Sequence, residues 1–237
     1  DAVNSGRISM KILDTKVKKI LMAKSWVGLD KYKPIEMKNL VEDLNSIKAD
    51  VLNHRFAHES ITCLKNDKKI LPINDLTQRI AVVSVEGTYE SDFLRMVKNY
   101  TDVDYYHIPK EANDSLVQSI VEKTSMYDVV LVGIHLINIR ASSKYGLTPS
   151  NIKHISKLAV QDNAVLSIFG NPFILGKIPE LAKSHTLLMA YQMTPLTESA
   201  AAQAIFGAIP TRGKLPISLD NSFYEGMGID LHPIQRL

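Results

Sequence analysis

The segment from His135 to Gly146 is the most polar loop that the sequence predicts. It follows an apolar run typical of a buried strand, and in open α/β sheets ligands bind where the strands end. Its hydrogen-bond donors are His135, Asn138, Arg140 and Lys144, and the three apolar residues between them would be exposed unless something covers them. We predict that these four residues line a substrate cleft or contact another domain. A loop folded back on its own domain is the alternative.

Known catalytic and cofactor motifs do not occur in the sequence. The segment Glu86–Glu90 follows an expected strand but has neither G-x-G-x-x-G spacing nor a G-K-[ST] ending. No G-x-S-x-G elbow occurs, and Ser167 falls inside an expected strand. His54 and His58 have i, i+4 spacing, but Arg55 stands where a zinc-protease helix needs glutamate. We therefore predict no catalytic residue, no metal site and no cofactor in this chain.

Composition narrows the class of protein further. The 237 residues, 45% hydrophobic and 22% charged, can bury a full core and are typical of a globular protein of one or two domains. The net charge of +3 is too balanced to indicate nucleic-acid binding. The longest apolar run, 128–134, has the length of a strand, so no membrane span is expected. Cys63 is the single cysteine, which excludes an internal disulfide. Because the chain begins at Asp1, we expect a fragment or a processed product. The sequence does not indicate the cellular compartment of the parent protein.

From residue 78 onward, apolar runs alternate with amphipathic segments. The expected strands are 80–85, 103–108, 129–134, 164–169 and 186–191. The expected helices are 91–99, 114–125, 149–162, 178–184 and 195–206. Nearly continuous apolar strands joined by crossover helices favour a parallel sheet that is covered on both faces. We predict an α/β three-layer sandwich over residues 76–220, with a mostly parallel sheet of five or six strands, the sixth being an edge strand at 215–218.

Residues 1–75 have mainly helical patterns instead, with a short segment of strand composition at 61–64 (ITCL). Asp14 is expected to cap a helix that stops at Gly28, and a second helix is expected from 35 to 60. Thr194 and Pro195 begin the last helix of the sandwich, and Gly207 is placed to end it. Residues 221–237 lack periodicity and are interpreted as a linker or a strap.

Several segments, in chain order, resemble glycoside hydrolase family 3. The similarity is carried by 3–9 (VNSGRIS), 12–29, 59–67 (ESITCLKND) with 70–73, 169–173 (FGNPF), and 206–218 (FGAIPTRGKLPIS). The first two resemble the exit from the family's catalytic barrel, and the last resembles the end of its C-terminal domain. The resemblance implies a retaining glycosidase whose N-terminal barrel supplies an aspartate nucleophile. That barrel is missing from this sequence, so we expect the chain alone to be inactive and its partner to be the barrel.

The loop at His135 also indicates a branch of the family. In the β-glucosidase branch the matching loop provides the acid/base glutamate, whereas residues 135–146 contain no Asp or Glu. This departure resembles the β-N-acetylglucosaminidase branch, in which a histidine and an aspartate of a barrel loop supply the acid. The segments 169–173 and 203–210 resemble Bacteroidetes-type members of that branch, in which a β-lactamase-like serine hydrolase follows. The implied parent acts on a glycan and is a bacterial periplasmic or extracytoplasmic protein.

Three alternatives stay open. The parent could be a β-glucosidase or β-xylosidase whose acid is Glu86 or Glu90. The chain could be a stand-alone flavodoxin-like binding module, although the sequence has no phosphate loop. It could also be a purely structural spacer, which differs from the first hypothesis only in whether the His135–Gly146 loop reaches substrate.

Overall fold

The computed structural model of the protein describes residues 1–136 and 140–234. The chain forms two compact units, Asp1–Ile47 and Lys48–Leu237. In the first unit, helix α1 spans Met10–Trp26, a 3-10 turn η1 spans Leu29–Lys31 and α2 spans Leu40–Leu44. The domain boundaries expected from the sequence remain predictions about the parent protein.

The caps of α1 correct one expectation and confirm another. Ser9 begins the helix, since its Oγ accepts the N–H of Ile12 at 3.3 Å. The predicted cap, Asp14, lies inside the helix. Gly28 follows the end of α1 with φ +82°, the left-handed conformation expected of a stop.

The single helix predicted from 35 to 60 is divided in two. After α2, Asn45 folds its side-chain amide back onto the carbonyl of Val41 at 2.8 Å. A side chain that bonds its own backbone competes with helix propagation. A new helix, α3, then spans Ile47–Ser60.

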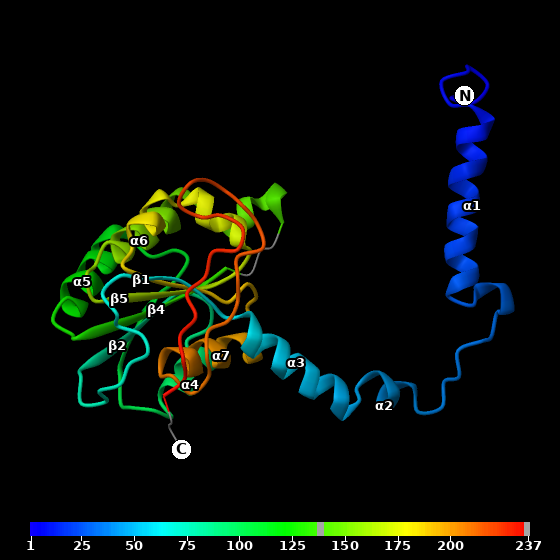
Figure 1. Ribbon diagram of the computed structural model, residues 1–237. Coiled ribbons are helices and arrows are strands. Elements are labelled where there is room, and N and C mark those ends of the chain that lie inside the picture. The colour runs from blue at the N-terminus through cyan, green and yellow to red at the C-terminus, as the bar shows by residue number, and fades with distance from the viewer. Residues whose placement is uncertain (137–139, 235–237) are drawn as a thin grey trace. The chain divides into compact units, whose positions relative to one another are not determined.

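The second unit contains one six-stranded sheet, as predicted. Its strands are β1 Thr62–Asn66, β2 Ile80–Glu86, β3 Asp104–Ile108, β4 Val129–His135, β5 Ala164–Phe169 and β6 Thr186–Met189. The spatial order is β1-β6-β5-β4-β2-β3, and every neighbouring pair is parallel except β1 with β6 (Figure 1).

The identity of the sixth strand differs from the prediction. The sixth strand is β1, which lies at one edge of the sheet with β3 at the other, whereas the segment 215–218 forms no strand. Leu215 instead exchanges hydrogen bonds with the tail, donating to the carbonyl of Met227 and accepting from Gly226. The strand predicted to reach Tyr191 also ends early, because Tyr191 has φ +61° and leaves the extended conformation.

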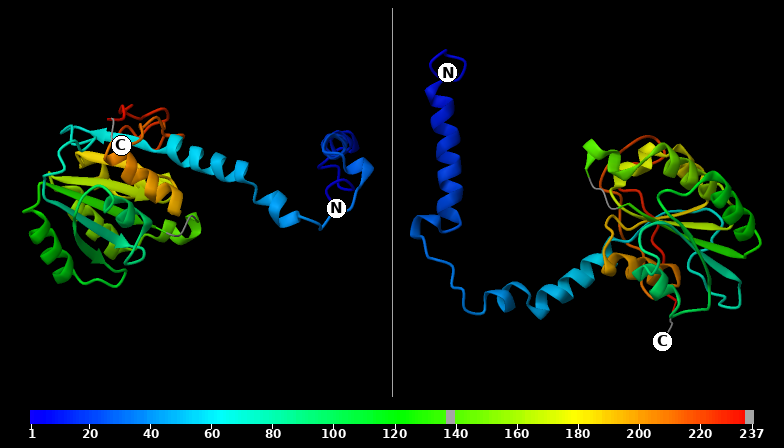
Figure 2. Two further views of the ribbon diagram at one scale, coloured as in Figure 1. Left: turned by 90° about the horizontal axis from the view of Figure 1, so that it is seen from below. Right: turned by 180° about the vertical axis from the view of Figure 1, so that it is seen from behind.

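Helices cover both faces of the sheet, which confirms the three-layer sandwich (Figure 2). The remaining elements are α4 Asp92–Val97, α5 Asp114–Thr124, η2 Ala141–Gly146, α6 Pro149–Ala159, η3 Pro172–Lys177, η4 Pro179–Lys183 and α7 Pro195–Ile205. One core cluster lies between the sheet and α5, α6 and η4, and a second lies between the sheet and α4 and α7. The helix predicted at 178–184 is the short 3-10 helix η4.

Helix α7 lies close to the sheet because its side chains are small. Thr194 and Thr197 form a capping box at its start, and Ala200, Ala201 and Ala202 are fully buried. Gly207 follows its end with φ +70°, as the sequence predicts. Without large side chains in between, the helix axis can approach the strands.

The C-terminal tail covers the outer edge of β1. Ile229 forms an isolated antiparallel bridge with Cys63, and Thr211 forms one with Leu231. Burial in the core cluster that includes α4 and α7 raises the pKa of the Cys63 thiol to about 12. Within the described part of the chain, no helix has the length and apolarity that crossing a membrane requires.

We predict that Gly207→Ala destabilises the second unit more than Gly226→Ala does. Both glycines have positive φ, but an added Cβ at Gly207 would lie 2.5 Å from Ile234 Cγ1, whereas at Gly226 nothing lies within 4 Å. Gly226→Ala should cost about 1 kcal/mol from backbone strain, and Gly207→Ala about 1–2 kcal/mol more from the clash. Urea unfolding measures the free energy of unfolding of both variants. Equal losses would show that the clash with Ile234 adds no cost at Gly207.

We also predict that the Cys63 thiol is inert in the folded protein. A thiolate is the reactive form, and a pKa near 12 leaves almost none of it at pH 8. Labelling with a thiol-specific disulfide reagent should be slow in buffer and rapid in denaturant. Fast labelling under native conditions would show that the core around Cys63 opens readily in the folded protein.

Candidate functional site

His135 lies at the carboxyl end of β4, beside Glu86 at the end of β2. Its side chain is fully buried. The imidazole occupies the room left by two glycines: an added Cβ would lie 2.8 Å from His135 Cγ at Gly87 and 2.7 Å from His135 Nε2 at Gly133. The ring of Phe169 stacks on it, with centroids 4.9 Å apart and an interplanar angle of 19°. Packing therefore holds the imidazole in one orientation.

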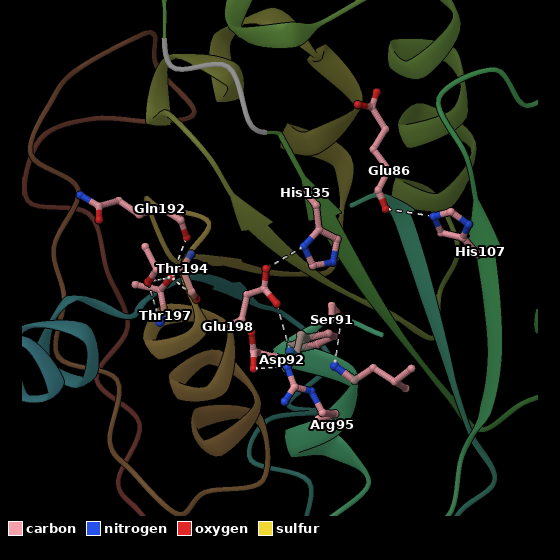
Figure 3. A network of polar contacts seen from close by, with 12 residues as sticks. Glu86, Ser91, Asp92, Arg95, His107, His135, Gln192, Thr194, Thr197 and Glu198 are labelled. Carbon is pink, nitrogen blue, oxygen red and sulfur yellow. Dashed lines mark hydrogen bonds and ion pairs between the residues drawn. The ribbon is translucent and has the colours of Figure 1, made fainter. Parts of the chain in front are cut away.

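Glu198, in the first half of α7, is the polar partner of His135 (Figure 3). Its Oε1 lies 3.2 Å from His135 Nδ1, and its Oε2 accepts the backbone N–H of Phe93 at 3.1 Å. Glu198 is only 6% exposed. Because a carboxylate only accepts hydrogen bonds, Nδ1 is the donor in this pair. One buried carboxylate thus connects α7, the end of β4 and the start of α4.

The other ring nitrogen of His135 is not paired. Among the described residues, Nε2 has no hydrogen-bond partner, and neither has the buried Oγ of Ser167 on the neighbouring strand β5. No group of three His, Cys, Asp or Glu side chains in the described ranges could hold a metal ion. The imidazole is enclosed, so it offers no group to a molecule in solvent.

The carboxylate of Glu86 is directed elsewhere. Glu86 has φ +58°, and its Oε1 accepts from Nδ2 of the buried Asn151 at 2.6 Å. In Figure 3 its side chain points away from His135, and its backbone carbonyl lies 3.3 Å from His107 Nε2. Asn151 also completes the capping box of α6 with Thr148. Glu86 is therefore bound to the N-terminus of α6, whereas Glu90 is exposed.

The structure describes three of the four loop residues that the sequence singled out, and it places them differently. His135 is buried, Arg140 and Lys144 are exposed, and Asn138 lies outside the described residues. Whether they contact substrate or a neighbouring domain stays a prediction. Sequence reasoning missed Glu198. The available signal was a lone acidic side chain in a helix of small residues.

The segment that follows contains consecutive left-handed residues. In η2, Lys144 has φ +50° and Tyr145 has φ +59°, and Gly146 follows with φ +81°. Two non-glycine residues in this conformation cost about 1–3 kcal/mol each, and such strain is concentrated at functional sites. It turns the Tyr145 ring onto that of Phe173, with centroids 6.0 Å apart and an interplanar angle of 9°.

A groove of about 390 Å³ opens beside this aromatic pair. Its described lining residues are Ala141, Lys144, Tyr145, Leu147, Thr148, Pro149, Ile152 and Lys177. None of these is acidic. The volume suits a single ring-sized ligand, and aromatic faces with a few polar groups are typical of small-molecule sites.

This architecture is that of a known glycosidase domain. Residues 61–227 match the glycosyl hydrolase family 3 C-terminal domain, and the chain therefore belongs to that family. No curated protein was found that matches the chain.

Solved structures with the same fold include enzymes of two activities. A family 3 β-N-acetylglucosaminidase from Paenibacillus sp. str. FPU-7 is 23% identical, with a TM-score of 0.59, over 92% of this chain and 41% of that one. A fungal multi-domain family 3 β-N-acetylglucosaminidase is 20% identical, with a TM-score of 0.58, over 99% and 26%. A β-glucosidase from Listeria innocua is 18% identical, with a TM-score of 0.62, over 92% and 34%. The chain thus spans less than half of each of these proteins.

We predict that Gly133→Ala is strongly destabilising, because the added methyl group would collide with an imidazole that Phe169 and Glu198 hold in place. The expected loss is about 2–3 kcal/mol of unfolding free energy. The matched control is Gly176→Ala, where the added Cβ would come no closer than 3.7 Å to Leu219. Chemical denaturation that gave both variants the same midpoint would show that the imidazole can move aside.

Proposed function

We propose that this chain is the non-catalytic C-terminal domain of a retaining β-N-acetylglucosaminidase of family 3. The observation that carries the proposal is the lack of any Asp or Glu between His135 and Gly146, the loop that resembles the acid-bearing loop of the β-glucosidase branch. Both activities occur among the structures of this fold, so the branch depends on that loop.

The positions of the nearby carboxylates support the proposal. Retention requires two carboxyl groups, or a substitute acid, about 5 Å apart around the anomeric carbon. Glu198 is buried against His135, and Glu86 is hydrogen-bonded to Asn151. Neither is presented to a sugar, so the chemistry falls to the catalytic barrel of the parent, and the chain alone has no hydrolytic activity.

The chain contributes binding surface to the parent in this proposal. The ring of Tyr145 would stack on a sugar ring in the groove, and Lys144, which lines the groove, would donate a hydrogen bond to it. Arg140, exposed one residue before the first lining residue Ala141, would be a second donor nearby. Helix α3 exposes 63% of Val51 and 61% of Phe56, apolar surface that suits contact with the barrel. A downstream serine hydrolase is the second partner that the resemblance implies.

One observation favours the second candidate, a β-glucosidase or β-xylosidase parent. Glu90 is exposed on the loop between β2 and α4, at the same edge of the sheet as the groove. In that case Glu90 would be the acid. A flavodoxin-like module has no comparable observation in its favour.

We predict that the full-length parent hydrolyses a chromogenic N-acetylglucosaminide in preference to the matching glucoside, and that this chain alone hydrolyses neither. Glu90→Gln in the parent should leave kcat within about twofold for a substrate with a poor leaving group, because Glu90 is not the acid in this proposal. Loss of a true general acid would lower kcat about 100-fold or more. Preference for the glucoside, or a large loss in Glu90→Gln, would favour the second candidate.

We also predict that Tyr145→Ala in the full-length parent raises KM about 5- to 10-fold with a smaller effect on kcat, since stacking contributes about 1 kcal/mol to binding. The control is Tyr224→Ala, which removes an exposed tyrosine that does not line the groove. An unchanged KM in Tyr145→Ala would indicate a spacer role for this face.

A further inference from the structure

Glu198 and His135 form a buried polar pair inside an otherwise apolar layer. The surrounding cluster contains Phe93, Leu131 and Phe169 together with the alanines of α7. A polar group buried without a full set of partners costs about 1–3 kcal/mol. His135 Nε2 incurs such a cost, because it has no partner among the described residues. Stability alone therefore does not account for this pair, since an apolar pair of the same volume would avoid the cost.

The pair lies at the carboxyl edge of the sheet, where the loops after β2 and β4 begin. Through Phe93 N–H, Glu198 holds the start of α4, where the loop from Glu86 to Ser91 ends. Through His135, it holds the end of β4, where Leu136 N–H still bonds the carbonyl of Phe169 at 3.0 Å. Figure 3 shows Glu198 reaching both elements from α7.

Packing restricts the movement of the His135 ring and of the elements around it. The imidazole is confined by Gly87, Gly133 and the Phe169 ring. Gly87 itself belongs to the loop after β2, so the ring of His135 also contacts that loop directly. Movement of any one of these elements would disturb the contacts of the other two.

We propose that Glu198 and His135 are positioning residues that couple the loop after β2 to the carboxyl end of β4, at His135 and Leu136. Glu198 accepts hydrogen bonds from both His135 and Phe93, and the imidazole packs between Gly87 and Gly133. The contacts of Glu198 and His135 are sufficient to argue the coupling within the domain. Its consequence for substrate rests on the proposed function, in which the loop after β4 borders the sugar groove.

The test is amide hydrogen exchange of this full chain, comparing Glu198→Ala with wild type. We expect the amides of residues 87–93 and of Leu136 to exchange at least about tenfold faster, because both ends of the coupling lose the same acceptor. Amides in α5 and β5 should be unchanged. Acceleration confined to α7, or to only one of the two loops, would overturn the proposal.

The matched control is Val117→Ala, which truncates a fully buried side chain in the other core cluster. It should accelerate exchange around α5 and leave both loops at the wild-type rate. Equal acceleration of the loops in this control would mean that they report general destabilisation rather than the pair. If Glu198→Ala does not fold, Glu198→Leu replaces it. Leucine fills a similar volume but cannot accept from Phe93 N–H or pair with His135, so both segments should exchange faster, and wild-type exchange in them would overturn the proposal.

Kinetics of the full-length parent test the consequence separately. Glu198→Ala, or Glu198→Leu where the alanine variant does not fold, should raise KM for the N-acetylglucosaminide severalfold, while Val117→Ala, assayed where both are folded, should not. A parent that hydrolyses no N-acetylglucosaminide would refute the proposed function and leave the exchange result intact. If hydrogen exchange shows the coupling but KM is unchanged, the pair does not affect substrate binding.

Discussion

The parallel sheet must be covered on both faces, and this requirement determines much of the second unit. Its central strands are fully buried, so each face needs a helical layer in close contact. On one side that layer includes α7, whose alanines allow its backbone to approach the strands. The close approach has a chemical consequence. It brings Glu198 within reach of His135 at the end of β4, which a helix with larger side chains would hold further away.

Small residues serve the same purpose on the sheet itself. Gly133, within β4, and Gly87, after β2, leave the volume that the imidazole of His135 fills. The carboxylate, the imidazole and the two glycines therefore form one steric unit that joins α7 to the ends of two strands. The loops that leave these ends include the strained Lys144–Tyr145 turn, whose conformation needs a rigid base to persist.

Much of the sandwich could be predicted because buried parallel strands are continuous apolar runs. The strands 80–85, 129–134 and 164–169 were found with boundaries correct to within one residue at either end. Prediction failed where non-local pairing decides. The segments 61–64 and 215–218 both resemble short strands in the sequence, and only the sheet shows that β1 pairs with β6 while the second segment bonds the tail. Asn45 likewise breaks a helix through one side-chain hydrogen bond that periodicity does not reveal.

For the candidate site, the sequence by itself determined which chemistry is lacking and where polar residues gather. It identified the loop at His135, the absence of a carboxylate there and the caps of α7 at Thr194 and Gly207. It could not separate the buried imidazole of His135 from the exposed Arg140 and Lys144, because a polar residue at the end of a strand or in the loop that follows can face either the core or solvent. The partnership with Glu198 was also invisible. It joins residues 63 positions apart, and only the packing of α7 on the sheet brings them together.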